Sequence, residues 1–393
     1  MFDLISLKNG LENVEGFYFD GVNAGFKKED NDLGFIRADE PFLLSAVFTS
    51  NKFQAAPIRH FLKYPANFKS NFILLNSKNA NAMTGKKGIE DIELLFENLS
   101  KKISLVNPIM SSTGVIGQRL KTEKMIKAFD KFDFNARSSD GVAKSIMTTD
   151  SFKKEIAFKV ELEGGKSFNI AAICKGAGMI NPSFATMLCY ILTDANIPKE
   201  DMDELLKQSV EQSFDRVSVD GDTSTNDTVM LFSSGLKDYD KTAFKTALDM
   251  ITKHLALELV RDGEGSTKVV AFNVIGAKNN EEARKVAVNL SNSLLVKTAL
   301  HGEDPNWGRI ASTVGASGVE CDEESLVIKY DDLIIYSYEF PELDSEREEK
   351  AYKIMKKDSY KISVDLGLGD GSYVAYGCDL GHKYVDINSS YRS

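Results

Sequence analysis

Apolar residues recur at helical spacing in the second half of the chain and predict three core-facing helices there. The three stripes are Met202-Leu206-Val210-Phe214, Phe244-Ala247-Leu248-Ile251-Leu255 and Ala283-Val286-Ala287-Leu290. Gly263 follows the second stripe closely, and glycine is favoured just past a helix end. In the first half, residues 90–99 and 122–129 are expected to be helical.

Short apolar runs between these helices have the length of buried strands. They cover residues 42–49, 72–75, 156–160, 168–174 and 267–275. The polar segment 163–166 predicts a hairpin between the third and fourth runs, and Asp370-Gly371 is a hairpin turn signal near the C-terminus. Strands and helices occur in both halves, so the fold class is expected to be α/β, a layered α+β sandwich.

One stretch near mid-chain stands out. The run 168–174 leads into Lys175 and two glycines, and Ala185-Thr186 then precedes a second apolar run that extends to Leu192. Taken alone, a threonine that opens an apolar helix is usually an N-cap. If the bond before Thr186 were cut, however, Thr186 would carry both a hydroxyl and a free α-amine. Such an amine titrates at about pH 7.7–8.0 and can act as the base for the hydroxyl.

Composition narrows the function classes. The 393 residues carry a formal net charge of −10, which disfavours a protein that tracks nucleic-acid phosphates. No apolar run approaches the ~18–20 residues of a membrane helix, and no secretory signal precedes the first strand, so a cytoplasmic location is expected. The four cysteines form no CxxC pair, so buried free thiols are expected rather than a zinc or disulfide site.

Three polar segments are ambiguous when each is taken by itself. Residues 220–228 are rich in acids and hydroxyls, but Thr225 stands where a calcium loop needs glycine, so a hydrogen-bonded turn or the wall of a site remains. Residues 261–268 combine opposite charges with two glycines. Residues 301–309 place Trp307 among polar side chains, which is compatible with a loop clamp.

Together these segments resemble the ornithine acetyltransferase (glutamate N-acetyltransferase) family of arginine biosynthesis along nearly the full chain. The matching motifs are Phe48-Thr-Ser-Asn-Lys52, Ser112-Thr-Gly-Val-Ile-Gly117, Lys175-Gly-Ala-Gly-Met179, Ala185-Thr-Met-Leu188, Asp220-Gly-Asp-Thr-Ser-Thr-Asn-Asp-Thr228, Arg261-Asp-Gly-Glu-Gly265, Gly302-Glu-Asp-Pro-Asn-Trp-Gly-Arg309 and Asn388-Ser-Ser-Tyr-Arg392. Several long motifs in one order are far more specific than any one of them.

The resemblance implies an N-terminal-nucleophile-like, self-processing fold shared with a group of self-processing aminopeptidases. The precursor would cleave itself between Ala185 and Thr186. An alpha fragment (residues 1–185) and a beta fragment (186–393) would then stay together, and two of each would form a heterotetramer.

The resemblance also implies roles for individual residues. Thr186 would be the nucleophile, and Thr113 and Gly114 would stabilise the oxyanion. The remaining matched positions would be substrate contacts, namely Thr149, Lys175, Glu264, Asn388 and Ser393. Ser393 stands where the family commonly has threonine, and Thr148 could take the place of its neighbour Thr149.

The expected activity is acetyl transfer from N-acetylornithine to glutamate through an acetyl-Thr186 intermediate, without a metal or cofactor. Whether acetyl-CoA also serves as a donor is left open by the sequence. The alternative enzyme is a self-processing aminopeptidase or amidase that releases the acyl group to water. A second alternative is not an enzyme but a small-molecule-binding protein, in which Thr186 merely caps a helix.

Overall fold

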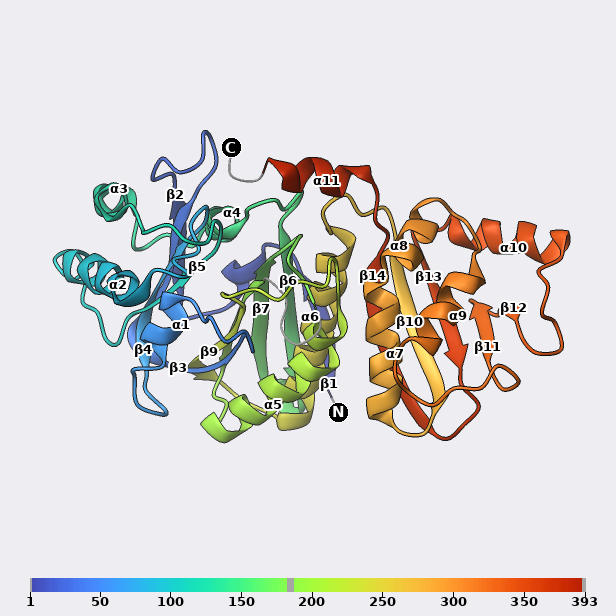
Figure 1. Cartoon of the computed structure of the whole chain (residues 1–393). Coiled ribbons are helices and arrows are strands. Elements are labelled where there is room, and N and C mark those ends of the chain that lie inside the picture. Colours follow the sequence, from blue (N-terminus) through green and yellow to red (C-terminus); the bar gives the residue numbers. More distant parts are fainter. Residues whose placement is uncertain (1, 182–186, 391–393) are drawn as a thin grey trace. The chain divides into compact units, whose positions relative to one another are not determined.

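Two sheets organise the chain, which the computed structural model describes over residues 2–181 and 187–390. The first belongs to a unit made of Met1–Gly176, Ser183–Asp215 and Thr223–Leu255. The second belongs to a unit made of Ala177–Pro182, Arg216–Asp222 and Ala256–Ser393. Both units combine a sheet with helices (Figure 1), which confirms the predicted mixed α/β class.

In the described part of the first unit, the sheet has nine strands in the order β1-β6-β7-β8-β9-β3-β4-β5, with β2 paired to β3. The strands are β1 (Phe2–Leu7), β2 (Tyr18–Val22), β3 (Leu33–Phe48), β4 (Ser70–Asn76), β5 (Ile109–Ser112), β6 (Lys154–Leu162), β7 (Ser167–Lys175), β8 (Leu188–Ala195) and β9 (Thr228–Lys237). β8 and β9, which follow Thr186 in the sequence, therefore lie between β7 and β3, which precede it.

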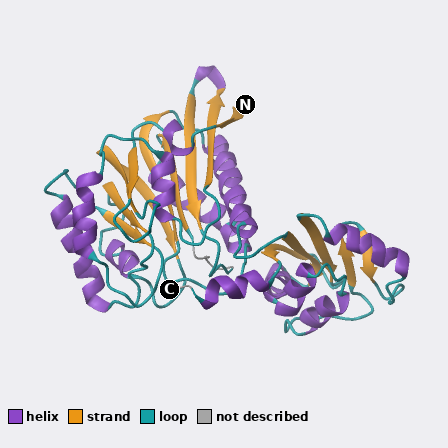
Figure 2. Cartoon of the chain, turned by 90° about the horizontal axis from the view of Figure 1, so that it is seen from above, coloured by secondary structure: helices purple, strands orange, loops and turns teal. Residues whose placement is uncertain are grey.

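The helices of this unit cover both faces of its sheet (Figure 2). They are α1 (Ala56–Phe61), α2 (Gly85–Leu99), α3 (Thr122–Ala128), α4 (Ser139–Ile146), α5 (Lys199–Gln212) and α6 (Lys241–Arg261), the last of which runs on into the second unit. Ala171 and Ile173 of β7 join the core under α4. Phe168 of the same strand meets Phe244 of α6 at 5.7 Å between ring centroids. Burial on both faces explains why this strand is a continuous apolar run.

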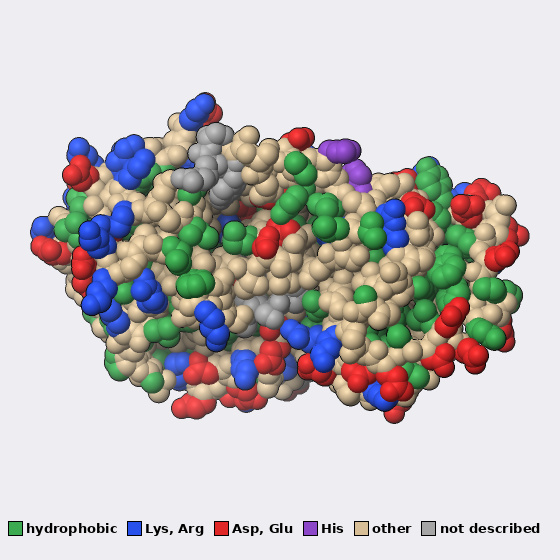
Figure 3. Space-filling view, in the orientation of Figure 1, with side chains coloured by type: hydrophobic (Ala, Val, Ile, Leu, Met, Phe, Trp, Pro, Cys, Tyr) green, Lys and Arg blue, Asp and Glu red, His purple; other side chains and the backbone are tan. Residues whose placement is uncertain are grey.

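The second unit has a five-stranded sheet among its described residues, in the order β12-β11-β13-β10-β14. Its strands are β10 (Val269–Ala277), β11 (Val327–Tyr330), β12 (Leu333–Tyr336), β13 (Ser359–Asp365) and β14 (Gly371–Cys378). Its helices are α7 (Asn280–Asn292), α8 (Leu294–His301), α9 (Trp307–Gly315), α10 (Ser345–Met355) and α11 (His382–Ser389). The apolar stripe of α7 packs into the core of this sheet, as predicted. Acidic side chains gather over α10 (Figure 3).

Two local predictions are wrong. The apolar run after Thr186 is not a helix but strand β8, whose eight residues are all buried, so residues 188–195 do not form the helix that the capping alternative requires. The turn signal at Asp370-Gly371 does not join a hairpin, because β10 lies between β13 and β14 and pairs with both. By contrast, the β6–β7 hairpin is confirmed, with the antiparallel pairs running from Lys154↔Cys174 to Glu161↔Ser167.

Strand pairing brings several sequence motifs to one edge of the first sheet. Lys175, the last residue of β7, pairs with Leu188, the first residue of β8. Leu188 pairs in turn with Thr228, which starts β9, and Thr228 pairs with Phe48, the last residue of β3. Motifs that are far apart in the sequence therefore share this edge.

Candidate active site

The loop that follows β5 presents two hydrogen-bond donors. Thr113 is 3% exposed, and its backbone N–H donates to the carbonyl oxygen of Asn76 at 3.1 Å. Gly114 has a φ of +129°, a conformation that glycine adopts readily and other residues rarely do. Among the hydrogen bonds of residues 2–181 and 187–390, the Gly114 N–H donates to no acceptor. This N–H is therefore available to a ligand.

Lys175 reaches this loop from the end of β7. Its ammonium Nζ donates to Thr113 Oγ1 at 3.2 Å, and the residue is 2% exposed. Burial lowers the pKa of Lys175, while the nearby carboxylate of Asp150 raises it. Because the hydroxyl oxygen of Thr113 accepts this bond, its hydrogen is left to donate elsewhere. The hydroxyl of Thr113 and the N–H of Gly114 together form a pair of donors of the kind that stabilises an oxyanion.

A buried ion pair lies behind Lys175. The side chains of Asp150 and Lys154 are both 0% exposed, and Lys154 Nζ lies 2.8 Å from Asp150 Oδ1. Burial alone would raise the pKa of Asp150, but the charges of Lys154 and Lys175 outweigh it and lower the pKa to about 2. Asp150 is therefore an anion throughout the physiological pH range.

The polar segment 220–228 holds the loop that follows β5, which is called the donor loop below. The side-chain amide of Asn226 donates to the carbonyl oxygens of Ala80 at 2.6 Å and Ser112 at 2.8 Å. Asp227, next in sequence, is buried and accepts the backbone N–H of Met187 on Oδ1 at 3.1 Å. Burial raises the pKa of Asp227 well above its usual value. This part of the segment is thus a structured wall rather than a surface turn.

The start of the same segment is a turn. Asp220 belongs to the second unit, where its carboxylate accepts the backbone N–H groups of Met179 at 2.6 Å, Ile180 at 2.9 Å and Asp222 at 3.2 Å. The sequence left open a hydrogen-bonded turn or a wall of a site for residues 220–228. The first half of the segment is the turn, and the second half is the structured part next to the donor loop.

Two more predicted substrate contacts meet in the second unit. Asn388, on α11, donates its side-chain amide to Glu264 Oε2 at 2.6 Å. Glu264 is 9% exposed, and its backbone N–H donates to the Ala177 carbonyl at 2.8 Å. A Cβ added to Gly178 would lie less than 3.0 Å from the Glu264 carboxylate, so a side chain at this position would displace that carboxylate.

The structure does not place all the predicted residues together. Thr113, Gly114 and Lys175 are together in the first unit, and Glu264 and Asn388 are together in the second. Thr149 is half-buried, and it is its neighbour Thr148 whose backbone N–H donates to Asp150. The predicted scissile pair Ala185-Thr186 and the predicted contact Ser393 lie outside the described residues.

Sequence reasoning missed four residues of this site. Asp150 directly follows the Thr148-Thr149 pair, and Lys154 is a lysine that opens an otherwise largely apolar strand. Asn226 and Asp227 belonged to a quoted motif but received no role. Lys154 lies four residues after Asp150, a spacing that could have indicated the ion pair, but its burial is seen only once the strands are placed.

Other expectations are tested more simply. Cys174, Cys189 and Cys378 are buried free thiols, as expected, whereas Cys321 is exposed. Trp307 is not a loop clamp, because it starts α9 and stacks on Tyr336 with ring centroids 4.4 Å apart. Within the described residues, no helix is long and apolar enough to cross a membrane.

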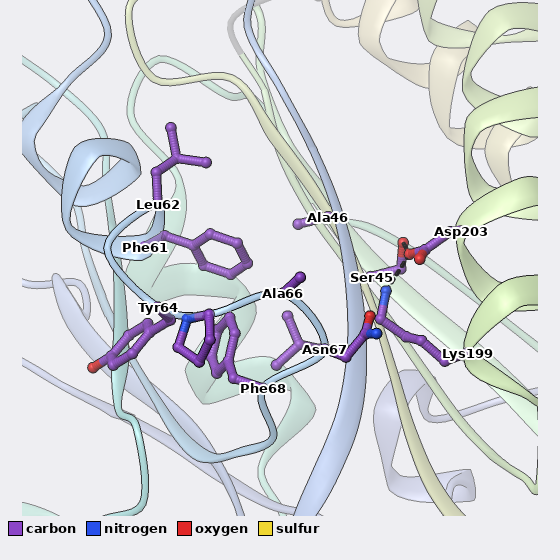
Figure 4. A pocket seen from close by; sticks show the side chains of 12 residues that line it. Ser45, Ala46, Phe61, Leu62, Tyr64, Ala66, Asn67, Phe68, Lys199 and Asp203 are labelled. Carbon is purple, nitrogen blue, oxygen red and sulfur yellow. Dashed lines mark hydrogen bonds and ion pairs between the residues drawn. The ribbon is translucent and has the colours of Figure 1, made fainter.

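A cavity of about 330 Å³ opens elsewhere in the first unit (Figure 4). Its aromatic wall includes Phe61 and Phe68, and its polar end is formed by Ser45, Lys199 and Asp203. Ser45 Oγ donates to Asp203 Oδ1 at 2.6 Å, and Lys199 forms an ion pair with the same carboxylate. None of the predicted site residues lines this cavity, so it is not the candidate active site.

A buried ammonium beside a hydroxyl and a backbone N–H is an arrangement compatible with the class of acyl-transfer enzymes. Comparison with known proteins places the chain more narrowly. A family model described as "ArgJ family" matches residues 18–393. The arginine biosynthesis bifunctional protein ArgJ of Wolinella succinogenes is 53% identical over 398 residues, which cover all of both chains. The chain belongs to the ArgJ family.

Other similar proteins bear the same name. The arginine biosynthesis bifunctional protein ArgJ of Chlorobaculum tepidum is 41% identical over 392 residues, covering 96% of both chains. A solved structure of the protein of that name from Bacillus halodurans is 40% identical, covers 50% of this chain and 96% of the solved one, and has a TM-score of 0.47. The family assignment rests on the sequence matches.

Proposed function

We propose that the chain is an acetyltransferase of arginine biosynthesis that moves an acetyl group from N-acetylornithine to glutamate through an acetyl-Thr186 intermediate. The observation that carries this proposal is the pair of available donors at Thr113 and Gly114, with Lys175 donating to the first of them. The bifunctional ArgJ name of full-length relatives supports the pathway. Family membership does not favour the amidase alternative.

In the first half of the reaction, Thr186 Oγ attacks the acetyl carbonyl carbon, and the α-amine of Thr186 takes the hydroxyl proton. The carbonyl oxygen becomes an oxyanion, which the Thr113 hydroxyl and the Gly114 N–H stabilise. The bond from this carbon to the ornithine nitrogen then breaks, and the proton passes to the leaving nitrogen. Acetyl-Thr186 and free ornithine result.

In the second half, the amine of glutamate attacks the ester carbonyl of acetyl-Thr186, and the same two donors stabilise the second oxyanion. The bond to Thr186 Oγ breaks, and Oγ recovers its proton. N-acetylglutamate leaves, and the free threonine is restored. A transferase of this kind needs glutamate for turnover, so N-acetylornithine incubated with and without glutamate tests the proposal. Equal release of ornithine in both samples would favour the amidase.

The substrate contacts are proposed from the same residues. The ammonium of Lys175 has N–H groups besides the one that it donates to Thr113, and these can bind the substrate carboxylate. Thr149 directly precedes Asp150 in the sequence and is the other proposed contact in this part of the chain. Glu264, held by Asn388, can bind the side-chain ammonium of ornithine. Ser393 keeps the hydroxyl of the threonine that is common at this position in the family.

Self-cleavage between Ala185 and Thr186 is the maturation step that we propose. Thr186 Oγ attacks the Ala185 carbonyl, the acyl group shifts from nitrogen to oxygen, and water hydrolyses the ester. The N-terminal-nucleophile character of the enzyme follows from this step. Mass spectrometry of the purified protein should find fragments 1–185 and 186–393, and Thr186→Ala should remain one chain. An active wild-type protein that stays intact would contradict the proposal.

Acetylation of glutamate from acetyl-CoA is the second activity that we propose, because full-length relatives carry the name bifunctional. No cofactor is needed, since acetyl-CoA is a substrate that would acetylate the same Thr186. Incubation with acetyl-CoA and glutamate, without N-acetylornithine, should yield N-acetylglutamate and free CoA. Absence of both products would restrict the enzyme to recycling acetyl groups.

We further propose a cytoplasmic heterotetramer of two alpha and two beta fragments. Three buried thiols without disulfides are compatible with a reducing compartment. Native mass spectrometry under non-denaturing conditions measures the assembly directly, and a mass of one alpha plus one beta fragment would contradict it.

A further inference from the structure

The carboxylate of Asp150 joins three separate parts of the first unit. Its Oδ1 accepts the Lys154 ammonium at 2.8 Å and the backbone N–H of Gly176 at 2.6 Å. Its Oδ2 accepts the backbone N–H of Thr148 at 2.9 Å. Gly176 directly follows Lys175, so the bond to its N–H fixes the backbone from which the Lys175 side chain extends.

The charges of Lys154 and Lys175 both act on the Asp150 carboxylate, and the three side chains are almost completely enclosed. Among the described residues, Cys174 and Asp227 are the other acidic groups whose charge acts on Lys175. The pKa of Asp227 is raised by burial, so that carboxyl compensates the ammonium poorly. Among the residues that the structure describes, Asp150 is therefore the main anion that acts on Lys175.

The charge of Lys175 decides the direction of the hydrogen bond with Thr113. A protonated lysine can only donate, so Thr113 Oγ1 must accept and its hydrogen is free to point at an oxyanion. A neutral lysine has a lone pair and can accept that hydrogen instead. Loss of the proton on Lys175 would thus remove one of the two donors without moving any heavy atom far.

We propose that Asp150 is a positioning residue of the acyl-transfer site, which keeps Lys175 charged and its ammonium on Thr113 so that the threonine hydroxyl donates to the oxyanion. This inference rests on the proposed function only in taking Thr113 as an oxyanion donor. Asp150 touches no substrate in this arrangement and acts through Lys175.

The test uses the full-length mature protein and p-nitrophenyl acetate, an ester without an α-carboxylate, over a pH series from about 6 to 10. Wild-type hydrolysis should fall at alkaline pH as Lys175 loses its proton. Asp150→Asn should lower the rate at pH 8 and move this alkaline limb down by about one pH unit or more, since an adjacent opposite charge shifts a pKa by about 1–3 units. Mass spectrometry first checks that each variant is cleaved.

Lys154→Met gives the opposite expectation and guards against a misfolded Asp150→Asn. It removes the ammonium that competes for Asp150, so the alkaline limb should move up. Lys159→Met, on the exposed part of the same strand, is the matched control and should leave the limb where it is, because Lys159 pairs with Glu161 instead. If the Asp150–Lys154 ion pair were merely structural, Asp150→Asn and Lys154→Met would not be expected to move the alkaline limb in opposite directions.

The outcomes separate this inference from the proposed function. A lowered melting temperature with an unmoved alkaline limb in Asp150→Asn would overturn the positioning role, as would a downward shift or no shift in Lys154→Met. A loss confined to N-acetylornithine, with normal ester hydrolysis, would also overturn it, because the effect would then lie at the substrate carboxylate. A wild type that hydrolyses the ester but does not transfer acetyl to glutamate would overturn the proposed function alone. A wild type active on neither substrate would overturn both.

Discussion

Gly114 lies against the backbone of Lys78 so closely that a Cβ on Gly114 would come within 3.0 Å of the Lys78 carbonyl carbon. Real Cβ atoms essentially never approach a neighbour this closely. The Val115 N–H also donates to the Lys78 carbonyl at 3.3 Å, so the two loops are fixed to each other at this point. The contact sets where the Gly114 N–H points.

Gly114→Ala should therefore displace the donor loop. We expect a loss of about 1–3 kcal/mol in the free energy of unfolding from the strained φ and the contact. The acetyl-transfer rate should fall about 10²-fold, as when one oxyanion donor is lost. Denaturant unfolding and single-turnover kinetics measure the two effects. Gly117→Ala is the matched control, because Gly117 also has a positive φ but no atom within 4 Å of its added Cβ. A similar loss of rate in both variants would contradict the explanation.

Asn226→Ala should loosen the same loop from its other side. Removal of the amide leaves the Ala80 and Ser112 carbonyl oxygens without this donor, which costs about 1–3 kcal/mol of stability for buried groups. Misplacement of Thr113 should lower kcat, by up to about 10²-fold for a shift near 1 Å. Asn71→Ala is the control, since Asn71 similarly bridges the Ser104 carbonyl and the Val106 N–H away from the site. Stability should fall in both variants, but kcat in Asn226→Ala alone.

Asp194→Asn should stabilise the protein at neutral pH. Asp194 is buried on β8, and burial raises its pKa to about 6. Protonated Asp194 thus stabilises the folded state. This contribution to the unfolding free energy is complete below the ordinary pKa of 3.8 and is lost as the pH rises through about 6. The amide removes the buried charge, so the unfolding free energy at pH 7.5 should rise by about 1–3 kcal/mol. The gain should shrink toward pH 4.

Asp39→Asn should change the unfolding free energy in the opposite direction in the same experiment. The hydrogen bond from Arg37 lowers the pKa of this exposed carboxyl, so its contribution is present above about pH 4 and lost as the pH falls further. The amide variant should be slightly less stable at pH 7.5 and equal to the wild type in acid. Urea melts at several pH values compare the two variants, and a destabilised Asp194→Asn at pH 7.5 would refute the prediction.

Glu264→Gln should weaken binding of N-acetylornithine. The change keeps the shape of the side chain, removes its charge and disturbs the bond from Asn388. Hydrogen bonds to a charged group contribute about 1.5–3 kcal/mol, so KM should rise about tenfold or more. Steady-state kinetics with separate titration of each substrate measure this. Glu320→Gln, an exposed carboxylate paired with Lys278, is the control, and an unchanged KM in Glu264→Gln would exclude Glu264 as a substrate contact.

Local elements were predictable where a periodic pattern coincided with burial. The stripe from Phe244 to Leu255 lies in α6, and the polar gap after Val160 does turn β6 into β7. Strand order was not predictable, because an apolar run does not say which strand lies beside it. For that reason Asp370-Gly371 was misread as a hairpin turn. The apolar run after Thr186 left the helix of the capping alternative open, because a short buried run does not distinguish a strand from a helix.

The site shows the same division. The motif residues Thr113 and Lys175 were recognised by resemblance, and the structure brings them to hydrogen-bond distance. Asp150 could not be found in this way, because it lies outside the matching motifs. Thr148 and Lys154 are near it in the sequence, but Gly176 comes close to it only in the folded chain. Sequence spacing carries information about neighbours along one element, whereas buried charge balance depends on all the elements around a group.

The place of β8 and β9 in the first sheet bears on when the proposed self-cleavage could occur. Without them, residues 1–185 contain one sheet piece of β1, β6 and β7 and another of β2, β3, β4 and β5, and no described strand joins the two. β8 can pair with β7 once residue 195 is made, but the sheet can close onto β3 only after synthesis of β9, which ends at residue 237. The proposed cleavage would thus follow the closure of this sheet, and each fragment would carry strands that the other needs to complete it.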